Sequence, residues 1–551
     1  MKKSLSSFIT ILIIMMVIVG CSSSTTEPTN DSNEGDSNTS STDSNSGMPD
    51  RPFVYVAQQV VGSVDPAKHT DETELIAVLN TYDPLVYPKV KEGSMEPGSH
   101  IAETWEVSED GKTYTFKLTE GVTFQSGNPL TAKDVVYSIQ RMMAIKQGFS
   151  WLWSGVLNPD NVVAKDDYTV EFTLDSAYAP FVSTLTQLFI VDSETLKANQ
   201  ADGEFGDNGD YGQKYLEEKV AGSGPYTLEK WERGSQLTFA KYDNYFKGWS
   251  EGQIEEFQMK IITEQATVKT MLVSGEADMV HQWLTVDTYK EFASTEGIKV
   301  QEDPSVQLYH LPINTQKAPT DDVNVRKAIS YAFDYTIATE QIMNGAVQAQ
   351  GPVPVLVPGH NDQVTVYNKD IEKAKEYLAQ SKYAGQELEV EFMYLSENPF
   401  QRQIAQLLQS NLAEIGITVK LNGGPWTQIT ETTAKVETTP HIASISDTLK
   451  YPHVDSHTFG IYHPSAHGSY RSSAWYDDAA TTELLETARK STVVEEQMEN
   501  YQEAQALIVE NAPSVYVANP NHRIAFQDYV EGYNYVGLLG YDLGFYNLTV
   551  K

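Results

Sequence analysis

The sequence predicts an α/β protein built as two lobes, and three observations carry this prediction. The chain has 551 residues, more than one hydrophobic core usually serves, so two or three domains are expected. Strand–helix–strand patterns occur twice, at 254–283 and at 388–421. A helical crossover is the connection that parallel strands require, so each pattern predicts an α/β unit. Because the two patterns lie far apart along the chain, we expect them in different lobes.

Before the first of these patterns, the chain is rich in strand signals. Asp110-Gly111 is a strong hairpin signal between two extended stretches. Thr131, followed by an acid in the first turn, is typical of a helix N-cap. Apolar patterning predicts strands at 53–56, 114–118 and 170–174. We therefore expect a β-rich section in the first half of the chain.

A glycine follows the predicted helix in each of the two crossovers. In the first, apolar residues share one helical face over 268–272, and Gly275 comes next. In the second, helical spacing runs over 404–415, and Gly416 comes next. Glycine reaches the left-handed conformation that commonly ends a helix, so both helices are expected to stop there.

The C-terminal section begins with a long predicted helix. Its spacing runs from about Val494 to Glu510, and Pro513 cannot continue it. A strand signal follows at 514–517, and short strands are expected from there to the end of the chain.

The first twenty residues have the organisation of an export signal. A charged start precedes an apolar run at 8–19, which is too short for a membrane-spanning helix of ~20 residues. The exit, Ile18-Val19-Gly20-Cys21, resembles the lipobox of bacterial lipoproteins, in which the chain is cleaved before an acylated cysteine. We therefore expect 1–20 to be a lipoprotein signal peptide and Cys21, the single cysteine, to be lipidated. Two acyl chains give a stable anchor, so the mature protein is expected at a membrane surface.

The segment at 21–52 is predicted to be the acylated cysteine followed by a disordered linker. From Ser22 to Pro49 it consists almost entirely of Ser, Thr, Asn, Asp, Glu and Gly, and so has too little apolar surface to offset its ordering entropy. The formal net charge of the chain is −36, and removal of the signal takes away two lysines and no acid. Such a balance repels phosphate backbones, so nucleic acid is not an expected partner.

No recognised catalytic spacing occurs in the sequence. It lacks a Gly-x-Ser-x-Gly nucleophile elbow, a phosphate-binding Gly-x-x-x-x-Gly-Lys loop, a dinucleotide glycine fingerprint and a His-Glu-x-x-His zinc helix. With Cys21 committed to lipid, no thiol nucleophile remains. An exported two-lobed protein of this kind is expected to capture a small molecule between its lobes, without catalysis and without a cofactor.

Several segments, taken in chain order, resemble landmarks of the family 5 extracellular solute-binding proteins, the peptide and nickel receptors of ABC importers. The resemblance spans the chain from residue 53 to its end. The matching segments are Val61–Ala67, Ile101–Phe124, Pro129–Val135, Gly222–Tyr226, Ile313–Thr315, Asn324–Ile329 and Ala504–Pro513. The resemblance implies a three-domain Venus flytrap fold like that of periplasmic binding proteins, with a discontinuous domain I, an inserted β-rich domain II and an α/β domain III.

The resemblance also implies where the domains lie and how they act. Domain I is expected over 53–95, 221–299 and 520–551, domain II over 96–220 and domain III over 300–519. Two strands would join domains I and III, and ligand binding would close the lobes for delivery to the permease subunits of an ABC transporter. The protein is expected to be a monomer, held by its lipid on the outer face of a bacterial cytoplasmic membrane.

Domain III of peptide-binding relatives has a segment resembling Trp-x-Ala-Asp-Tyr-x-x-Pro, whose aspartate binds the α-ammonium of the ligand. Aligned on Tyr451, this chain has Lys450 at the place of that aspartate, which would reverse the charge of the site. Asp447 takes the role instead if the loop is longer. Trp426 lies close to the position of an upstream tryptophan of the relatives, and Asp455 follows in the same loop.

Further candidates for ligand contact come from this loop and from the other domains. Nickel-binding relatives use a histidine in the loop to complete a metal chelate, and His453 and His457, spaced four apart, are the candidates for that role. Trp153 falls in the region of domain II expected to face the cleft. Gln58 and Gln59 follow the first strand, at the expected edge of the cleft.

Four ligand or activity classes remain open at this point. Peptides or peptide-like compounds are the default, because they are the commonest ligands of the family. Carbohydrates or carboxylate-bearing ligands are favoured by Lys450 and by the aromatic content. A receptor for nickel or another chelated metal is a further alternative. An exported metallohydrolase that uses the histidines with Asp455 is a remote one.

Overall fold

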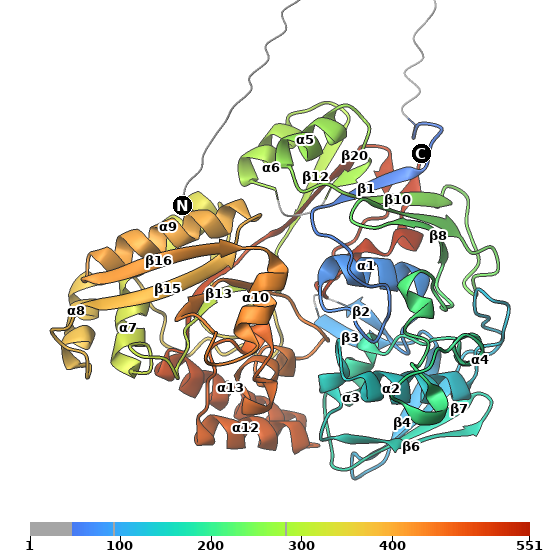
Figure 1. The fold of residues 1–551 in the computed structure, drawn as a ribbon, viewed down its shortest axis with the longest axis horizontal. Coiled ribbons are helices and arrows are strands. Elements are labelled where there is room, and N and C mark those ends of the chain that lie inside the picture. The colour runs from blue at the N-terminus through green and yellow to red at the C-terminus, as the bar shows by residue number, and fades with distance from the viewer. Residues whose placement is uncertain (1–46, 92–93, 281–283) are drawn as a thin grey trace, which may run out of the picture. The chain divides into compact units, whose positions relative to one another are not determined.

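The computed structural model describes residues 47–91, 94–280 and 284–551 (Figure 1). The predicted signal peptide, Cys21 and most of the predicted linker lie outside the described residues. None of the helices in the described part of the chain has both the length and the apolar character needed to cross a bilayer.

A seven-stranded sheet collects strands from three separate parts of the chain, in the order β12-β20-β11-β1-β10-β9-β8. Its strands are β1 (Phe53–Ala57), β8 (Tyr226–Glu232), β9 (Gln236–Lys241), β10 (Glu256–Ile261), β11 (Met279–Val280), β12 (Ile298–Asp303) and β20 (His522–Gln527). β1 lies between β10 and β11 and runs parallel to both. The first predicted crossover, from β10 through α5 (Gln265–Val273) to β11, is confirmed.

Helices cover both faces of this sheet. Alternate side chains of β1 point to opposite faces, and each set packs against a different group of helices. Phe53 and Tyr55 pack in one cluster with Ile76 of α1 (Glu72–Thr81). Val54 and Val56 pack in another cluster with residues of α5 and of α6 (Val286–Ala293). A strand buried on both sides in this way reads as a continuous apolar run, which is why it was predictable.

The β-rich section forms a four-stranded antiparallel sheet in the order β4-β5-β7-β6. Its elements are β4 (Ala102–Val107), β5 (Thr113–Leu118), β6 (Leu157–Asp166), β7 (Thr169–Leu174), α2 (Ala132–Ile145), α3 (Phe181–Thr184) and α4 (Ser193–Ala198). The predicted hairpin joins β4 to β5, with Gly111 at a φ of +67°. The predicted helix begins after Thr131, whose N–H donates to Asp134 Oδ2 at 2.9 Å. A separate hairpin, β2 (Tyr87–Lys91) with β3 (Ser94–Gly98), precedes this sheet.

Two further sheets form from the part of the chain between β12 and β20. One is antiparallel and contains β14 (Val347–Gln348), β19 (Ser514–Asn519), β13 (Leu308–Pro312) and β18 (Ile445–Asp447). The other is parallel and contains β16 (Ile417–Gly424), β15 (Leu388–Leu395) and β17 (Ile442–Ala443). The helices are α7 (Val323–Ala332), α8 (Ile371–Gln380), α9 (Pro399–Ala413), α10 (Trp426–Thr433), α11 (Phe459–Tyr462), α12 (Ala479–Lys490) and α13 (Val494–Asn511).

The predictions for this part of the chain are confirmed. α9 connects β15 to β16 and packs on both, as the second crossover requires (Figure 1). Gly416 follows α9 at a φ of +82°. The long C-terminal helix is α13, and the strand predicted after it is β19.

The chain crosses between the seven-stranded sheet and the β13–β19 sheet twice. Residues 304–307 join β12 to β13, and residues 520–521 join β19 to β20. Two crossings of this kind, with a β-rich section inserted before β8, agree with the three-domain organisation expected from the sequence. The expected boundaries at 95/96 and 299/300 fall inside β3 and β12.

A buried ion pair joins α2 to the segment after β1. Arg141 donates to both carboxylate oxygens of Asp65, each at 2.6 Å, and its Nε donates to the Tyr211 carbonyl at 2.8 Å. Burial opposes ionisation of Asp65, but the Arg141 guanidinium holds the pKa of that carboxyl below its usual value. The pair therefore stabilises the contact between α2 and the segment after β1 only while both Arg141 and Asp65 are present.

Replacing Arg141 by methionine is expected to lower the free energy of unfolding by about 3 kcal/mol, because Asp65 would stay buried without its partner. Urea unfolding of wild type and Arg141→Met at pH 7 measures the difference. Since the pKa of Asp65 is depressed in the folded state, the difference should shrink as the pH falls below the unfolded-state pKa of ~3.9. Lys165→Met, which removes a half-exposed ion pair with Glu171, is the control and should cost less than about 1 kcal/mol. Equal losses in the two variants would contradict the prediction.

Candidate functional site

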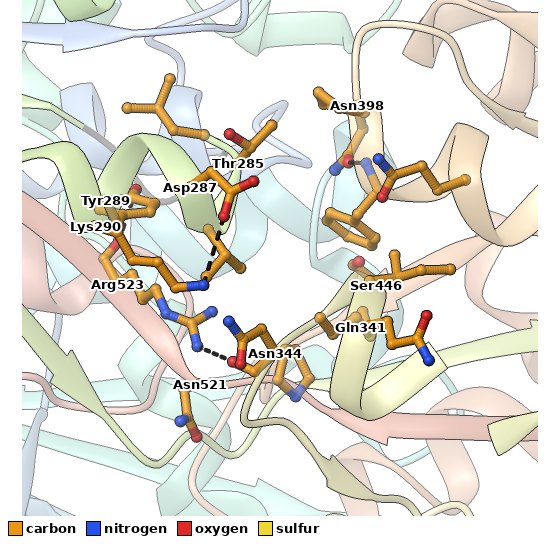
Figure 2. Close-up of a pocket in the computed structure, with 18 of the residues that line it drawn as sticks. Thr285, Asp287, Tyr289, Lys290, Gln341, Asn344, Asn398, Ser446, Asn521 and Arg523 are labelled. Carbon is orange, nitrogen blue, oxygen red and sulfur yellow. Dashed lines mark hydrogen bonds and ion pairs between the residues drawn. The ribbon is translucent and has the colours of Figure 1, made fainter. Parts of the chain in front are cut away.

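A cavity of about 250 Å³ lies beside the two crossings. Figure 2 shows Thr285, Asp287, Lys290 and Arg523 on one side of it and Gln341, Asn398 and Ser446 on the other. The first side comes from the start of α6 and from β20. The second comes from a π-helical turn at Ile337–Ile342, from the start of α9 and from β18. The cavity is therefore lined by parts of the chain that lie on either side of the crossings.

Local sequence signals fix the two helix starts that line the cavity. Asn398 caps α9, where its Oδ1 accepts a hydrogen bond from the Phe400 N–H at 3.2 Å, and Pro399 occupies the first helical position. Thr285 caps α6 by accepting from the Thr288 N–H at 3.2 Å. These caps hold polar side chains and the Phe400 ring at the wall of the cavity.

The charged residues of the cavity are paired with their neighbours. Arg523 donates to both carboxylate oxygens of Glu302 at 3.0 Å, and its Nη2 donates to the Asn344 carbonyl at 2.6 Å. Asp287 and Lys290 form an ion pair at 3.5 Å (Figure 2). Because Arg523 lies on β20 and Asn344 follows the π-helical turn, the bond between them connects the two sides. The cavity thus offers hydrogen-bonding groups rather than an unpaired charge.

A second group of polar residues, the charge cluster, consists of Asp447, Lys450, His457 and Arg471, all buried. Asp447 accepts hydrogen bonds from Arg471 Nε at 3.0 and 3.1 Å and from Arg471 Nη2 at 2.6 Å. Lys450 Nζ lies 3.3 Å from Asp447 Oδ1, and His457 Nε2 lies 3.6 Å from Asp447 Oδ2. Burial opposes ionisation of Asp447, but Arg471 and Lys450 hold its pKa below its usual value. Burial also lowers the pKa of His457 to about 4, so its ring is neutral at pH 7.

Asp455 is the centre of a separate network in the same loop. It accepts from Tyr451 OH at 2.6 Å and from Tyr501 OH at 2.7 Å, and Arg489 Nε lies 3.4 Å from its Oδ2. His453 Nδ1 accepts from the Asp455 N–H at 3.1 Å, and burial lowers the pKa of His453. Asp455 therefore joins the loop that follows β18 to Tyr501 of α13 and Arg489 of α12, which stabilises the conformation of the loop.

β18 separates the cavity from the charge cluster. Successive side chains of a strand point to opposite faces, so Ser446 lines the cavity while Asp447 belongs to the cluster. The structure therefore brings the predicted residues Asp447, Lys450 and His457 together, on the face of β18 opposite the cavity.

The other predicted residues have different neighbours. Trp426 is half-buried and packs edge-on against Tyr470, with ring centroids 4.6 Å apart. Gln58 and Gln59 are half-buried and follow β1. Trp153 is fully buried, and its Nε1 donates to Thr184 Oγ1 at 2.9 Å, which favours a packing role for it.

The histidines of the loop do not form a metal-binding group of their own. Among the described residues, no set of three or more His, Cys, Asp or Glu side chains could hold a metal ion. His453 and His457 lie at the two ends of a 3₁₀ turn at 454–456 and have different partners. A single histidine that completes a bound chelate needs no such set, so that alternative stays a prediction.

Arg471 and the lining of the cavity were not predicted from the sequence. One feature of the sequence could have indicated Arg471: it is the only Lys, Arg, Asp or Glu between Ser456 and Tyr476. No such feature marks the cavity, because its lining comes from segments that are separated in sequence and share no motif.

Comparison with known proteins gives a consistent result. The sequence profile of the bacterial extracellular solute-binding proteins, family 5, matches residues 96–476. The chain is 28% identical over 476 residues to the probable D,D-dipeptide-binding periplasmic protein of Escherichia coli, with 86% of this chain and 89% of that protein covered.

Two solved structures superpose on most of the chain. The ABC transporter-associated periplasmic binding protein of Helicobacter pylori, in complex with the peptide STSA, gives a TM-score of 0.80 at 25% identity, covering 91% of this chain and 98% of that one. The oligopeptide-binding protein of Bacillus subtilis, in complex with a nonapeptide, gives 0.80 at 20% identity, covering 91% and 99%. The predicted α/β, three-domain Venus flytrap fold with a discontinuous domain I is thereby confirmed.

His457 is expected to make the protein less stable in mild acid. Between pH 6.5 and about 4 the unfolded chain binds a proton that the buried, neutral His457 does not, so the free energy of unfolding falls as the pH is lowered through this window. At pH 4 this difference in protonation lowers the free energy of unfolding of the wild type on the order of 3 kcal/mol, and His457→Gln is expected to remove this decrease. Urea unfolding of wild type and variant at several pH values from 7.5 to 4 measures it. An unchanged pH profile in the variant would contradict the prediction.

Proposed function

Because the chain belongs to family 5 of the bacterial extracellular solute-binding proteins, we propose that it is the substrate-binding subunit of an ABC importer and delivers a peptide or peptide-like solute to a permease. The family acts in transport and not in catalysis, so the metallohydrolase alternative is set aside. The peptide-binding names of its relatives and the peptide complexes of its structural neighbours support this ligand class.

The position of the cavity at the two crossings carries this proposal. Its lining includes Gln307 from one crossing and Pro520 from the other, besides the groups on either side. A solute held there contacts both sides at once. Such a ligand favours the closed arrangement of the lobes because it gains contacts that exist only when both sides meet.

The lining suits a peptide. Six of its side chains are amides, namely Gln307, Gln341, Asn344, Asn398, Gln403 and Asn521. Each amide offers two donors and one acceptor oxygen, which matches the alternating groups of a peptide backbone. The Phe400 ring adds an apolar wall for a side chain. Amides and an aromatic ring also suit an oligosaccharide, so that alternative is kept as an outcome of the test below.

We propose a contact role for the charge cluster as well. Asp447 ends β18 and contacts Lys450 and His457 of the loop that follows, where the resemblance to peptide-binding relatives places a ligand contact. Trp426 packs on Tyr470 nearby. For the domains, sheet membership supports the expected boundaries at 220/221 and 519/520, whereas those at 95/96 and 299/300 each cut a strand. We propose that domain I runs through Asp303, so that β12 stays whole.

The lipid anchor is part of the proposed function. The signal and Cys21 imply a protein held outside the cytoplasmic membrane by two acyl chains, with the polar segment before Phe53 as its tether. An anchor of this kind keeps the receptor close to the permease that it serves, and the protein acts as a monomer.

Filling the cavity should block ligand binding. Ser446→Phe adds a large side chain at the wall, and no hydrogen bond of the Ser446 hydroxyl is present among the described residues to be lost. A pool of dipeptides to pentapeptides is expected to raise the melting temperature of the wild type but not that of the variant. Native mass spectrometry of the purified protein identifies a solute that remains bound.

The matched control is Ser235→Phe, in the exposed turn between β8 and β9, which should respond to the peptides like the wild type. A shift caused by oligosaccharides or nickel chelates, and not by peptides, would assign the ligand to that class. A peptide shift that persists in Ser446→Phe would show that the ligand binds elsewhere.

Cys21→Ser is expected to move the protein from the membrane fraction to the soluble fraction of its host, because the thiol that accepts the lipid is lost. Detergent phase partitioning and labelling with radioactive palmitate measure the change. Retention of label in the variant would show that another residue is lipidated.

A further inference from the structure

The charge cluster holds more positive than negative charge. Asp447 is its one carboxylate, and Arg471 and Lys450 are both cations. His457 adds no charge at pH 7, because burial lowers its pKa to about 4. All four residues are buried, with Lys450 3% exposed and Asp447 0% exposed. An unpaired charge is costly to bury, so an excess of one positive charge in this place indicates a missing partner.

Neighbouring groups do not supply that partner. Among the described residues, Asp447 is the only acidic residue within 4 Å of either Lys450 Nζ or the Arg471 guanidinium. Asp455, in the same loop, is already paired with Arg489. His310 faces the cluster from β13 and is neutral, because burial lowers its pKa to about 3.

Arg471 also has a free donor group. Its Nε and Nη2 bond to Asp447, and Nη2 also bonds to the Ser456 carbonyl at 2.6 Å. Its Nη1 is buried and, among the described residues, has no hydrogen-bond partner. Buried donors are nearly always bonded in native proteins, so a free one needs an explanation.

The free donor lies where two parts of the chain meet. A Cβ placed at Gly460 would lie 2.8 Å from Arg471 Nη1 and 3.3 Å from Trp151 Cη2. Trp151 belongs to the β-rich section, and its ring centroid is 5.8 Å from the guanidinium carbon. Nη1 therefore lies at the contact between the β-rich section and the loop after β18, next to Gly460 and Trp151.

We propose that the charge cluster binds a carboxylate of the ligand, with Arg471 Nη1 and Lys450 Nζ as the donors. This inference rests on the proposed receptor function and specifies the charge of the solute. One carboxylate balances an excess of one positive charge, and the planar guanidinium edge suits its geometry. A free ammonium group at the same place is repelled by both cations. The preferred solutes are therefore peptides or peptide-like acids whose end at this cluster is anionic.

Matched peptide pools test the proposal on the wild-type protein. One random tetrapeptide pool is prepared in three forms: with both termini free, with an acetylated N-terminus and free carboxylate, and with a free N-terminus and C-terminal amide. The two acid forms are expected to raise the melting temperature, the acetylated form most, and the amide form is not. This comparison does not depend on any variant folding correctly.

Variants of Lys450 then assign the donor. For one acetylated peptide recovered from the pool by native mass spectrometry, Lys450→Gln is expected to weaken binding about tenfold, and Lys450→Arg to restore most of it. Asp447 keeps its bonds to Arg471 in both variants. Lys435→Gln, at an exposed position after α10, is the control and should bind like the wild type.

The outcomes separate this inference from the proposed function. Equal binding of acid and amide pools, or unchanged affinity in Lys450→Gln, would overturn the carboxylate assignment and leave the receptor function standing. If no pool of any form binds, the proposed peptide-receptor function fails and the inference fails with it. Loss of binding in Lys450→Gln that Lys450→Arg does not restore would show that charge is not what matters at this position.

Discussion

The two short crossings between the seven-stranded sheet and the β13–β19 sheet are the constraint on which the site depends. They are bonded to each other, because Ser305 Oγ donates to the Pro520 carbonyl and Asn519 Nδ2 donates to the Gln307 carbonyl at 3.0 Å. Two linked segments of four and two residues leave little freedom in how the flanking elements meet. The starts of α6 and α9 are therefore brought to the same cavity, although they are far apart in sequence.

The loop after β18 has a second task besides carrying the charge cluster. The Lys450 carbonyl accepts from Gln187 Nε2 at 2.5 Å, and the Arg489 carbonyl accepts from the Ala179 N–H at 2.9 Å. The Arg489 guanidinium lies over the Tyr178 ring, 4.3 Å from its centroid. The β-rich section thus contacts the loop at Lys450 and α12 at Arg489. A ligand bound at the cluster as proposed would also stabilise this contact and so couple recognition to closure.

Local signals made most of the fold predictable, and non-local contacts hid much of the site. Thr131, Gly275 and Gly416 mark helix ends through their own backbone preferences, so a single sequence reveals them. Trp153 shows the limit, because neighbouring residues in sequence do not determine whether an aromatic ring faces a cleft or a core, and here it is buried. Arg471 was missed because its role depends on Asp447, 24 residues away along the chain.

From the sequence, Lys450 and Asp447 are alternative candidates for one role, whereas the structure pairs them at 3.3 Å. Asp447 accepts three hydrogen bonds from the guanidinium of Arg471, and charge-assisted bonds in this bidentate arrangement are among the strongest in proteins. An incoming ammonium would have to compete with that guanidinium for the carboxylate and would meet two fixed cations. An incoming carboxylate would meet a donor that has no hydrogen-bond partner among the described residues. The proposed contact would therefore place the anionic end of a solute at Lys450, with Asp447 serving to position Arg471.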